Sequence, residues 1–237
     1  MEGQDFLFYC VGVDYMDRSF DARIEKEIET KLEREMQDSG VDIRVRCQDG
    51  YVTLFGFVDT LGEKNAAGEI AGLIDGVKSV ENSLTISTDG TITDKEIEAE
   101  VISKLKGIPS ITSVSAKVKE GVAVLEGTVQ TLKDKNLAIH QASKALGVKD
   151  IASHIHVDSL YKIDDVTINN EVQRQLVNAD LDDCDIKVEI ENGAVTLKGF
   201  VDTSNEVETA LEITEGVDGV RNVKNYLKLR EKGQFNG

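Results

Sequence analysis

The chain repeats one glycine-marked pattern three times along its 237 residues. In each copy a glycine precedes a segment of alternating apolar residues, a second glycine lies six residues later, and a Gly-Val pair begins 20 residues after that. The first glycines of successive copies are 71 and then 72 residues apart. A period held this closely predicts tandem modules built from the same elements. The glycines, interpreted as structural turn and packing positions, are Gly50, Gly56 and Gly76, then Gly121, Gly127 and Gly147, then Gly193, Gly199 and Gly219.

Upstream of each glycine segment, apolar residues recur every four positions, which is typical of a helix with one buried face. An aspartate lies three positions before each of these stripes: Asp21, Asp94 and Asp165. We expect these carboxylates to cap a helix start rather than to take part in catalysis. In the second copy, Thr93 and Glu96 have the spacing of a capping box. The stripes are Ile24, Ile28 and Leu32; Ile97, Val101 and Leu105; and Ile168, Val172 and Leu176.

Downstream of each helix, the sequence predicts a hairpin, a second helix and a last strand. Asp49-Gly50 and Asn192-Gly193 are strong signals for a two-residue hairpin turn, and the first hairpin spans about 42–48 and 51–58. The second helices are predicted at 62–74, 133–146 and 205–216, each ended by its Gly-Val pair, and the last strands at 80–86, 151–157 and 223–229.

Each module therefore has the order α-β-β-α-β. The two strands joined by the second helix should be parallel, with a right-handed crossover. The predicted fold is an α+β two-layer sandwich, a three-stranded mixed sheet with two helices on one face.

The predicted domains are residues 20–88, 89–160 and 161–231, preceded by a segment 1–19 and followed by a tail 232–237. The apolar run Phe6 to Val13 in the first segment is interpreted as an extra strand that covers an open sheet face or pairs along a sheet edge. The short connections, 87–93 and 158–166, lead us to expect packing between neighbouring modules.

The pattern resembles the BON domain (bacterial OsmY and nodulation) family, whose signature reads Gly-x-Val-x-Leu-x-Gly-x-Val, then Gly-Val, then Val-x-Asn-x-Leu. The resemblance covers about residues 20 to 231 and implies a bacterial, non-catalytic protein. It further implies roles at phospholipid surfaces, in osmotic stress, or, in one cytoplasmic branch, in potassium binding. The second copy departs at Ala123 and Ser153. The first and third copies match at Gly50, Val52, Leu54, Gly56, Val58, Gly76, Val77, Val80, Asn82 and Leu84, and at Gly193, Val195, Leu197, Gly199, Val201, Gly219, Val220, Val223, Asn225 and Leu227.

The charge distribution limits the classes of partner. The formal net charge of −17 divides into −3 for residues 1–19, −6 for 20–88, −1 for 89–160 and −7 for 161–237. Nucleic acids and anionic membranes repel such a chain. No apolar run approaches the roughly 20 residues that cross a bilayer, and acidic residues rather than Lys or Arg precede the first apolar stretch. The chain as given is therefore predicted to be cytoplasmic, or periplasmic if an export signal has been removed.

Residues that could carry chemistry form no recognised constellation. No nucleophile elbow, phosphate loop or dinucleotide fingerprint is present, which favours a protein that is not an enzyme. The odd number of cysteines (Cys10, Cys47 and Cys184) argues against a disulfide framework, and Cys47 is interpreted as a buried thiol. Alternation separates His154 and His156 from His140, so surface histidines are expected rather than a metal site.

The cofactor prediction is none, with weak K⁺ or Ca²⁺ binding as an alternative. The acidic run from Asp180 to Asp185 is interpreted as a solvated loop, and a weak Ca²⁺ or Mg²⁺ site is its alternative because the spacing of an EF-hand is missing.

Alternation also places large apolar side chains on the sheet face that no helix covers. Such patches usually mark contacts, with a neighbouring module of the same chain or with another protein. The leading hypothesis is a non-enzymatic binding or assembly protein that acts through protein contacts, or self-association, on these open faces. The alternatives are a potassium sensor linked to osmotic stress and a phospholipid-surface binding protein. The interface candidates are Tyr51, Phe55, Phe57, Val122, Val124, Phe200 and Tyr226.

Overall fold

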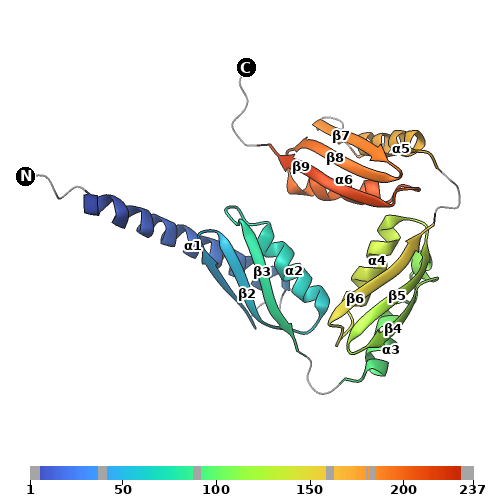
Figure 1. Cartoon of the computed structure of the whole chain (residues 1–237), viewed down its shortest axis with the longest axis horizontal. Coiled ribbons are helices and arrows are strands. Elements are labelled where there is room, and N and C mark those ends of the chain that lie inside the picture. Colours follow the sequence, from blue (N-terminus) through green and yellow to red (C-terminus); the bar gives the residue numbers. More distant parts are fainter. Residues whose placement is uncertain are drawn as a thin grey trace, which may run out of the picture. The chain divides into compact units, whose positions relative to one another are not determined.

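The computed structural model describes residues 6–36, 42–87, 92–158, 163–179, 181 and 185–230, with side chains from residue 20 onward. Three modules follow one another, and in each the two helices pack against one face of a three-stranded sheet (Figure 1). The predicted α+β sandwich and its triplication are confirmed.

The first module shows the register of the common sheet. Its middle strand pairs antiparallel with the first strand, so that Val45 lies opposite Leu54, and parallel with the third, so that Leu54 lies beside Asn82. The predicted hairpin and the predicted parallel pair are therefore both present. The elements are α1 (Phe6–Met36), β1 (Ile43–Gln48), β2 (Tyr51–Val58), α2 (Leu61–Gly72) and β3 (Ser79–Ile86).

The other two modules keep this element order, and a short 3-10 helix, η2 (Pro109–Ile111), precedes the first strand of the second. In the third module the strand pairing repeats that of the first, antiparallel and then parallel. The second module consists of α3 (Asp94–Leu105), β4 (Ser115–Lys119), β5 (Val122–Val129), α4 (Leu132–Ser143) and β6 (Asp150–Val157). The third consists of α5 (Asp165–Asn178), β7 (Asp185–Glu191), β8 (Ala194–Val201), α6 (Ser204–Glu215) and β9 (Asn222–Leu229).

The apolar stripes form the helical side of the cores, as predicted. In the first module Ile24 and Ile28 are fully buried against Val52 and Leu54 of the middle strand. In the third, Val172 packs in the same cluster as Leu197. Burying one such side chain contributes about 1.5–3 kcal/mol, so each stripe stabilises its module substantially.

The hairpin turns have the backbone that their dipeptides predict. Asp49 and Gly50 have φ values of 53° and 79°, and Asn192 and Gly193 have 53° and 77°. Two successive left-handed residues define the type I′ turn, whose twist matches that of the flanking strands. The turn therefore sets the register of each hairpin.

The N-terminal segment is helical, so the predicted extra strand at Phe6 to Val13 is wrong. The segment belongs to α1, which continues without interruption into the stripe of the first module. Extending an existing helix adds one hydrogen bond for each residue fixed, whereas a new strand must find a partner. Among the described helices, none is both long and apolar enough to span a bilayer.

The Gly-Val pairs do not end the second helices, which corrects a second prediction. In the first module α2 ends at Gly72 with Leu73 as its C-cap, and Gly76 lies in the following turn with a φ of 96°. A Cβ on Gly76 would lie 2.7 Å from the Cζ of Phe20 and 3.1 Å from the Cδ1 of Ile24. The glycine is needed because α1 packs directly over this turn.

The aspartates before the stripes bind the hairpin turns, not the helix starts. The carboxylate of Asp21 accepts hydrogen bonds from the backbone N–H groups of Asp49 (2.8 Å) and Gly50 (3.1 Å). Asp94 and Asp165 do the same in their own modules: Asp94 binds Glu120 and Gly121, and Asp165 binds Asn192 and Gly193. We call this contact the turn clamp. The structural interpretation of these acids is thus correct, but the group that they cap was misassigned.

The helix starts use neighbouring residues instead. Asp164 is the N-cap of α5 and accepts from Thr167 N. The predicted capping box is present, because Thr93 N donates to the carboxylate of Glu96 and Glu96 N donates to Thr93 Oγ1. The aspartates of the clamp are therefore free to reach across to the sheet.

Candidate binding surface

The sheet face opposite the helices in the first module combines aromatic and cationic side chains. Alternation along β1 and β2 directs Val45 and Leu54 into the core, and their neighbours in sequence onto the open face. We call this surface the aromatic face. It is formed by Arg44, Arg46, Tyr51, Phe55, Phe57 and Lys78.

Two of its aromatic rings are largely exposed. Tyr51 retains 58% and Phe57 59% of its accessible surface, while Phe55 between them is half-buried. The Arg46 guanidinium lies 5.6 Å from the centre of the Phe55 ring, and the Lys78 ammonium lies 5.6 Å from the centre of the Tyr51 ring. Cation–π contacts of this kind hold each cation above a ring while the charge stays in solvent. The structure places the predicted residues on the open face.

The open faces of the other two modules carry a different set of apolar side chains. Val122 and Val124 are half-buried in the second module. Phe200 is 45% exposed and Tyr226 59% exposed in the third. On that third face, the Lys198 ammonium binds the Glu189 carboxylate at 2.5 Å. All predicted interface candidates thus lie on open faces, and among the described residues the first module alone gathers three aromatic residues on one hairpin.

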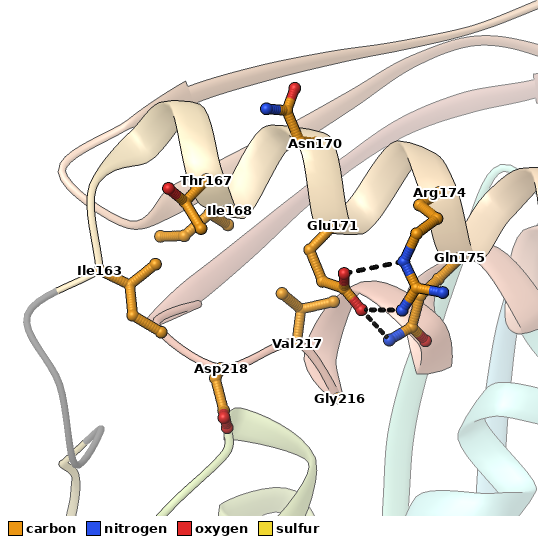
Figure 2. A pocket seen from close by; sticks show the side chains of 10 residues that line it. All are labelled: Ile163, Thr167, Ile168, Asn170, Glu171, Arg174, Gln175, Gly216, Val217 and Asp218. Atoms are coloured by element: carbon orange, nitrogen blue, oxygen red, sulfur yellow. Dashed lines mark hydrogen bonds and ion pairs between the residues drawn. The ribbon is translucent and has the colours of Figure 1, made fainter.

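The third module also has a groove of about 520 Å³ between α5 and the turn that follows α6 (Figure 2). The side chains of Glu171, Arg174 and Gln175 line one end of it, and Ile163 and Asp218 line the other. Neither the family resemblance nor a sequence motif predicted this groove, because its lining residues come from two segments that are far apart in the sequence of the module.

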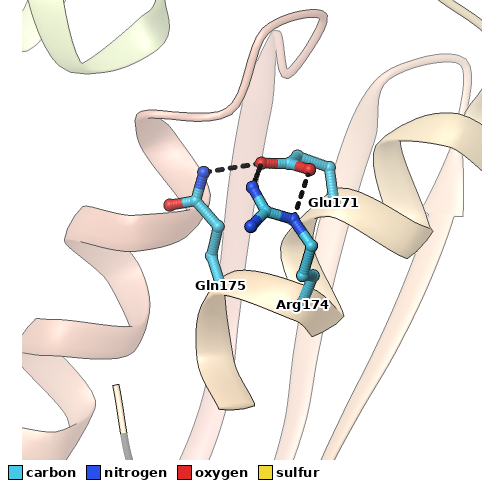
Figure 3. A network of polar contacts seen from close by, with 3 residues as sticks. All are labelled: Glu171, Arg174 and Gln175. Carbon is cyan, nitrogen blue, oxygen red and sulfur yellow. Dashed lines mark hydrogen bonds and ion pairs between the residues drawn. The ribbon is translucent and has the colours of Figure 1, made fainter. Parts of the chain in front are cut away.

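The carboxylate of Glu171 in this groove is already occupied. Its Oε2 accepts from Arg174 Nε at 3.0 Å, and its Oε1 accepts from the Arg174 guanidinium at 2.5 Å and from Gln175 Nε2 at 2.8 Å (Figure 3). The bond from Arg174 and then that from Gln175 lower the pKa of Glu171 to about 2. A group this acidic stays ionised at neutral pH and is poorly suited to general acid–base catalysis. We interpret the network as stabilising the surface of α5.

The remaining sequence candidates do not converge. His140 is exposed on α4, whereas His154 and His156 are exposed on β6. Within the described ranges, no three His, Cys, Asp or Glu side chains are placed to bind a metal ion. Most of the acidic run from Asp180 to Asp185 lies outside those ranges, as does Cys184. The alternatives of weak K⁺ or Ca²⁺ binding stay predictions.

Cys47 is held in the turn clamp of the first module. Its thiol donates to Asp21 Oδ1 at 3.2 Å, and its backbone N–H donates to Glu25 Oε1 at 2.7 Å. Burial and then the hydrogen bond to Asp21 raise the pKa of Cys47 to about 11. The side chain is half-buried, which corrects the predicted buried thiol, and its thiol is protonated at neutral pH.

The interface residues predicted from the sequence did not include the cations of the aromatic face. The signal was available, since Arg44 and Arg46 alternate with the inward residues Ile43 and Val45. Lys78 was harder to assign, because it precedes β3 and reaches Tyr51 only through the parallel pairing of β2 with β3.

Comparison with known proteins gives the family of the repeats. The family model described as BON domain matches residues 20–88, 93–159 and 164–231. The chain belongs to the BON domain family. The osmotically-inducible protein Y of Escherichia coli (strain K12) is 30% identical over 146 residues, which cover 58% of this chain and 73% of that protein. An uncharacterized protein in the gshII 5′ region of Anaplasma centrale is 27% identical over 136 residues, 54% of this chain and 90% of that protein.

Solved structures give weaker likenesses to this BON chain. The C-terminal domain of CdsD, the structural protein of the type III secretion system of Chlamydia trachomatis, is 18% identical with a TM-score of 0.26, covering 85% of this chain and 96% of that one. The PrgH periplasmic domain is 13% identical with a TM-score of 0.22, covering 80% of this chain and 95% of that one. Scores this low carry no conclusion about function.

Proposed function

We propose that this BON-repeat chain is a non-enzymatic binding or assembly protein that acts through protein contacts on its open sheet faces. The observation that supports this most strongly is the exposure of Tyr51 and Phe57 on a sheet face that the helices of their own module leave uncovered. Large aromatic side chains gathered on one face are typical of protein interfaces.

The roles of the acidic side chains agree with this proposal. The three clamp aspartates bind backbone N–H groups of the hairpin turns, and Glu171 binds Arg174 and Gln175. These carboxylates have structural partners, so none of them is poised to move a proton. These contacts are those expected of a scaffold that presents binding surfaces.

The relative in Escherichia coli is named for induction by osmotic change. We extend that setting to this chain and propose that its contacts are needed when osmolarity changes. The predicted cytoplasmic location and its periplasmic alternative stay predictions. The potassium-sensor alternative is separated from the binding proposal by thermal unfolding at matched ionic strength, since a sensor is stabilised by potassium more than by sodium.

Site-specific photo-crosslinking in the producing cells tests the proposal directly. A benzophenone amino acid replaces Phe57 on the aromatic face, and in a matched control it replaces Glu29, which is exposed on α1. We expect a discrete protein adduct from position 57 that is absent from position 29. Absence of any protein adduct from position 57, or equal adducts from both positions, would show that this face is not a protein interface.

A further inference from the structure

We infer that the aromatic face of the first module binds an extended, acidic protein segment. This inference rests on the proposed function and names the partner's chemistry. Three features carry it: the sign of the charge on the face, the availability of its cations, and their spacing along an edge strand.

The charge of the face is opposite to that of its module. Residues 20–88 carry a net charge of −6, yet Arg44 and Arg46 lie on the open side together with Glu81 of β3. Lys78, whose charge also acts on Asp21, reaches this side over the Tyr51 ring. Acidic residues elsewhere in the module are distributed over the helices and turns. A local positive surface on an acidic protein steers a negatively charged partner to that surface and away from the rest.

The cations are available to a partner. In the described part of the chain, the ion pairs involve neither Arg44 nor Arg46 nor Lys78. Arg46 and Lys78 instead lie above the rings of Phe55 and Tyr51. An arginine held in this way keeps its fork of N–H donors directed at solvent, which suits two-point binding of a carboxylate.

The spacing of the cations indicates an extended ligand. Arg44 and Arg46 are two positions apart on β1, which is an edge of the sheet. Side chains at such positions are about 7 Å apart, the same distance as alternate side chains of another extended chain. An acidic segment lying along β1 therefore matches both arginines with alternate carboxylates, and its apolar side chains reach Phe57 and Tyr51. Edge strands also offer unpaired backbone groups to such a segment.

A short acidic segment fits better than a nucleic acid. The net charge of −17 repels a long polyanion, and three cations neutralise few phosphates. A segment with a few carboxylates interacts mainly with the nearby cations of the aromatic face. The acidic surface farther away contributes little, because charges beyond about 8–10 Å are screened at physiological salt.

Titration of the isotope-labelled full-length chain with probe peptides tests this inference. The acidic probe is a soluble peptide of repeated Glu-Ser-Asp-Ser-Leu-Ser, which places alternate carboxylates and a leucine on one face of an extended chain. The neutral probe has Gln and Asn in place of the acids. We expect the acidic probe to shift the amide resonances of β1 and β2 and the neutral probe to leave them unchanged. The double variant Arg44→Glu, Arg46→Glu should weaken binding at least about tenfold.

The matched control reverses two exposed lysines on the third module, Lys224→Glu and Lys228→Glu, which changes the net charge by the same amount. Equal weakening by this control would assign the binding to net charge and overturn the inference. Equal binding of both probes, no binding of the acidic probe, or tighter binding of phosphatidylglycerol vesicles or oligothymidylate would also overturn it. In each of these cases a protein adduct from position 57 would still uphold the proposed function, so the two failures are distinguishable.

Discussion

The open faces of the first and third modules differ at the same two positions of the same hairpin. In the first module, Arg46 of β1 lies over the Phe55 ring of β2. At the matching positions of the third module, Glu189 of β7 binds Lys198 of β8. At these two positions the first module offers a cation and a ring to solvent, whereas the third pairs a cation with a carboxylate. The same arrangement of elements thus carries two different surfaces.

The comparison teaches which residues belong to the scaffold and which to the surface. Turn clamp, turn glycines and inward strand residues agree between the two modules. The outward positions vary freely, because solvent tolerates both an ion pair and an aromatic residue there. Function is therefore expected to reside in the outward positions.

The largest expected effect is the loss of stability when a strand glycine of the first or the third module gains a side chain. A common scaffold requires the same loss in both modules. Gly56 and Gly199 have φ values of 132° and 125° within their strands, and a Cβ there would collide with the carbonyl oxygens of Asp42 and Asp185. Each Gly→Ala change should destabilise its own module by roughly 2–4 kcal/mol. Hydrogen exchange followed by mass spectrometry measures this module by module, and a cost in only one of them would contradict the common geometry.

The turn clamps should differ in strength. Asp21 accepts from the Cys47 thiol as well as from two N–H groups, whereas Asp165 has the two N–H groups in its clamp. Asp21→Asn and Asp165→Asn should each cost about 1–3 kcal/mol, with the larger loss at Asp21. Exchange rates of the amides of Gly50 and Gly193 report the two effects. Equal protection loss would show that the thiol contributes nothing.

The clamp of the first module also predicts sensitivity to acid. Burial alone would raise the pKa of Asp21, but hydrogen bonds from Asp49, Cys47 and Gly50, with the charge of Lys78, bring it below its ordinary value of 3.8. Because the folded-state pKa is the lower one, the stabilisation is fully present above the unfolded pKa and is lost as the pH falls through the folded pKa. Unfolding of the first module in urea between pH 5 and pH 2 should lose this dependence in Asp21→Asn.

The surface network of α5 sharpens the contrast between the two modules at low pH. Glu171 has a pKa of about 2, and its position corresponds to Glu27 in α1, which is followed by Thr30 and Lys31 instead of Arg174 and Gln175. Its stabilisation should persist above about pH 4.5 and vanish towards pH 2. Glu171→Gln should remove that dependence from the third module, while Glu27→Gln changes the first less. Urea unfolding with module-resolved resonances decides between them.

The smallest effects concern the two surface pairs themselves. Double-mutant cycles should give a coupling of about 0.5–1 kcal/mol for Arg46 with Phe55, and about 0.2–1 kcal/mol for Glu189 with Lys198. Raising the salt concentration should weaken the second coupling more than the first, since exposed ion pairs are screened. If salt weakened the coupling of Arg46 with Phe55 more than that of Glu189 with Lys198, the distinction between the two faces would be wrong.

Local patterns in the sequence were sufficient for most of the fold. The stripe Ile24, Ile28 and Leu32 predicted a helix and its buried face, and Asp49-Gly50 predicted the hairpin turn. These signals depend on residues within a few positions of each other, where periodicity and backbone stereochemistry act directly. The aromatic residues of the open face followed from the same alternation.

The errors occurred where a residue's partner lies far along the chain. Asp21 precedes a helical stripe and was assigned to a helix start, but it binds a turn 28 and 29 positions away. Gly76 was assigned to the end of α2, although it is Phe20 of α1 that excludes a side chain there. The sequence determined the elements, their order and their inward faces. Only the tertiary structure decided which groups the aspartates bind and which cations lie over which rings, because those contacts form between segments whose separation in sequence bears no relation to their distance in space.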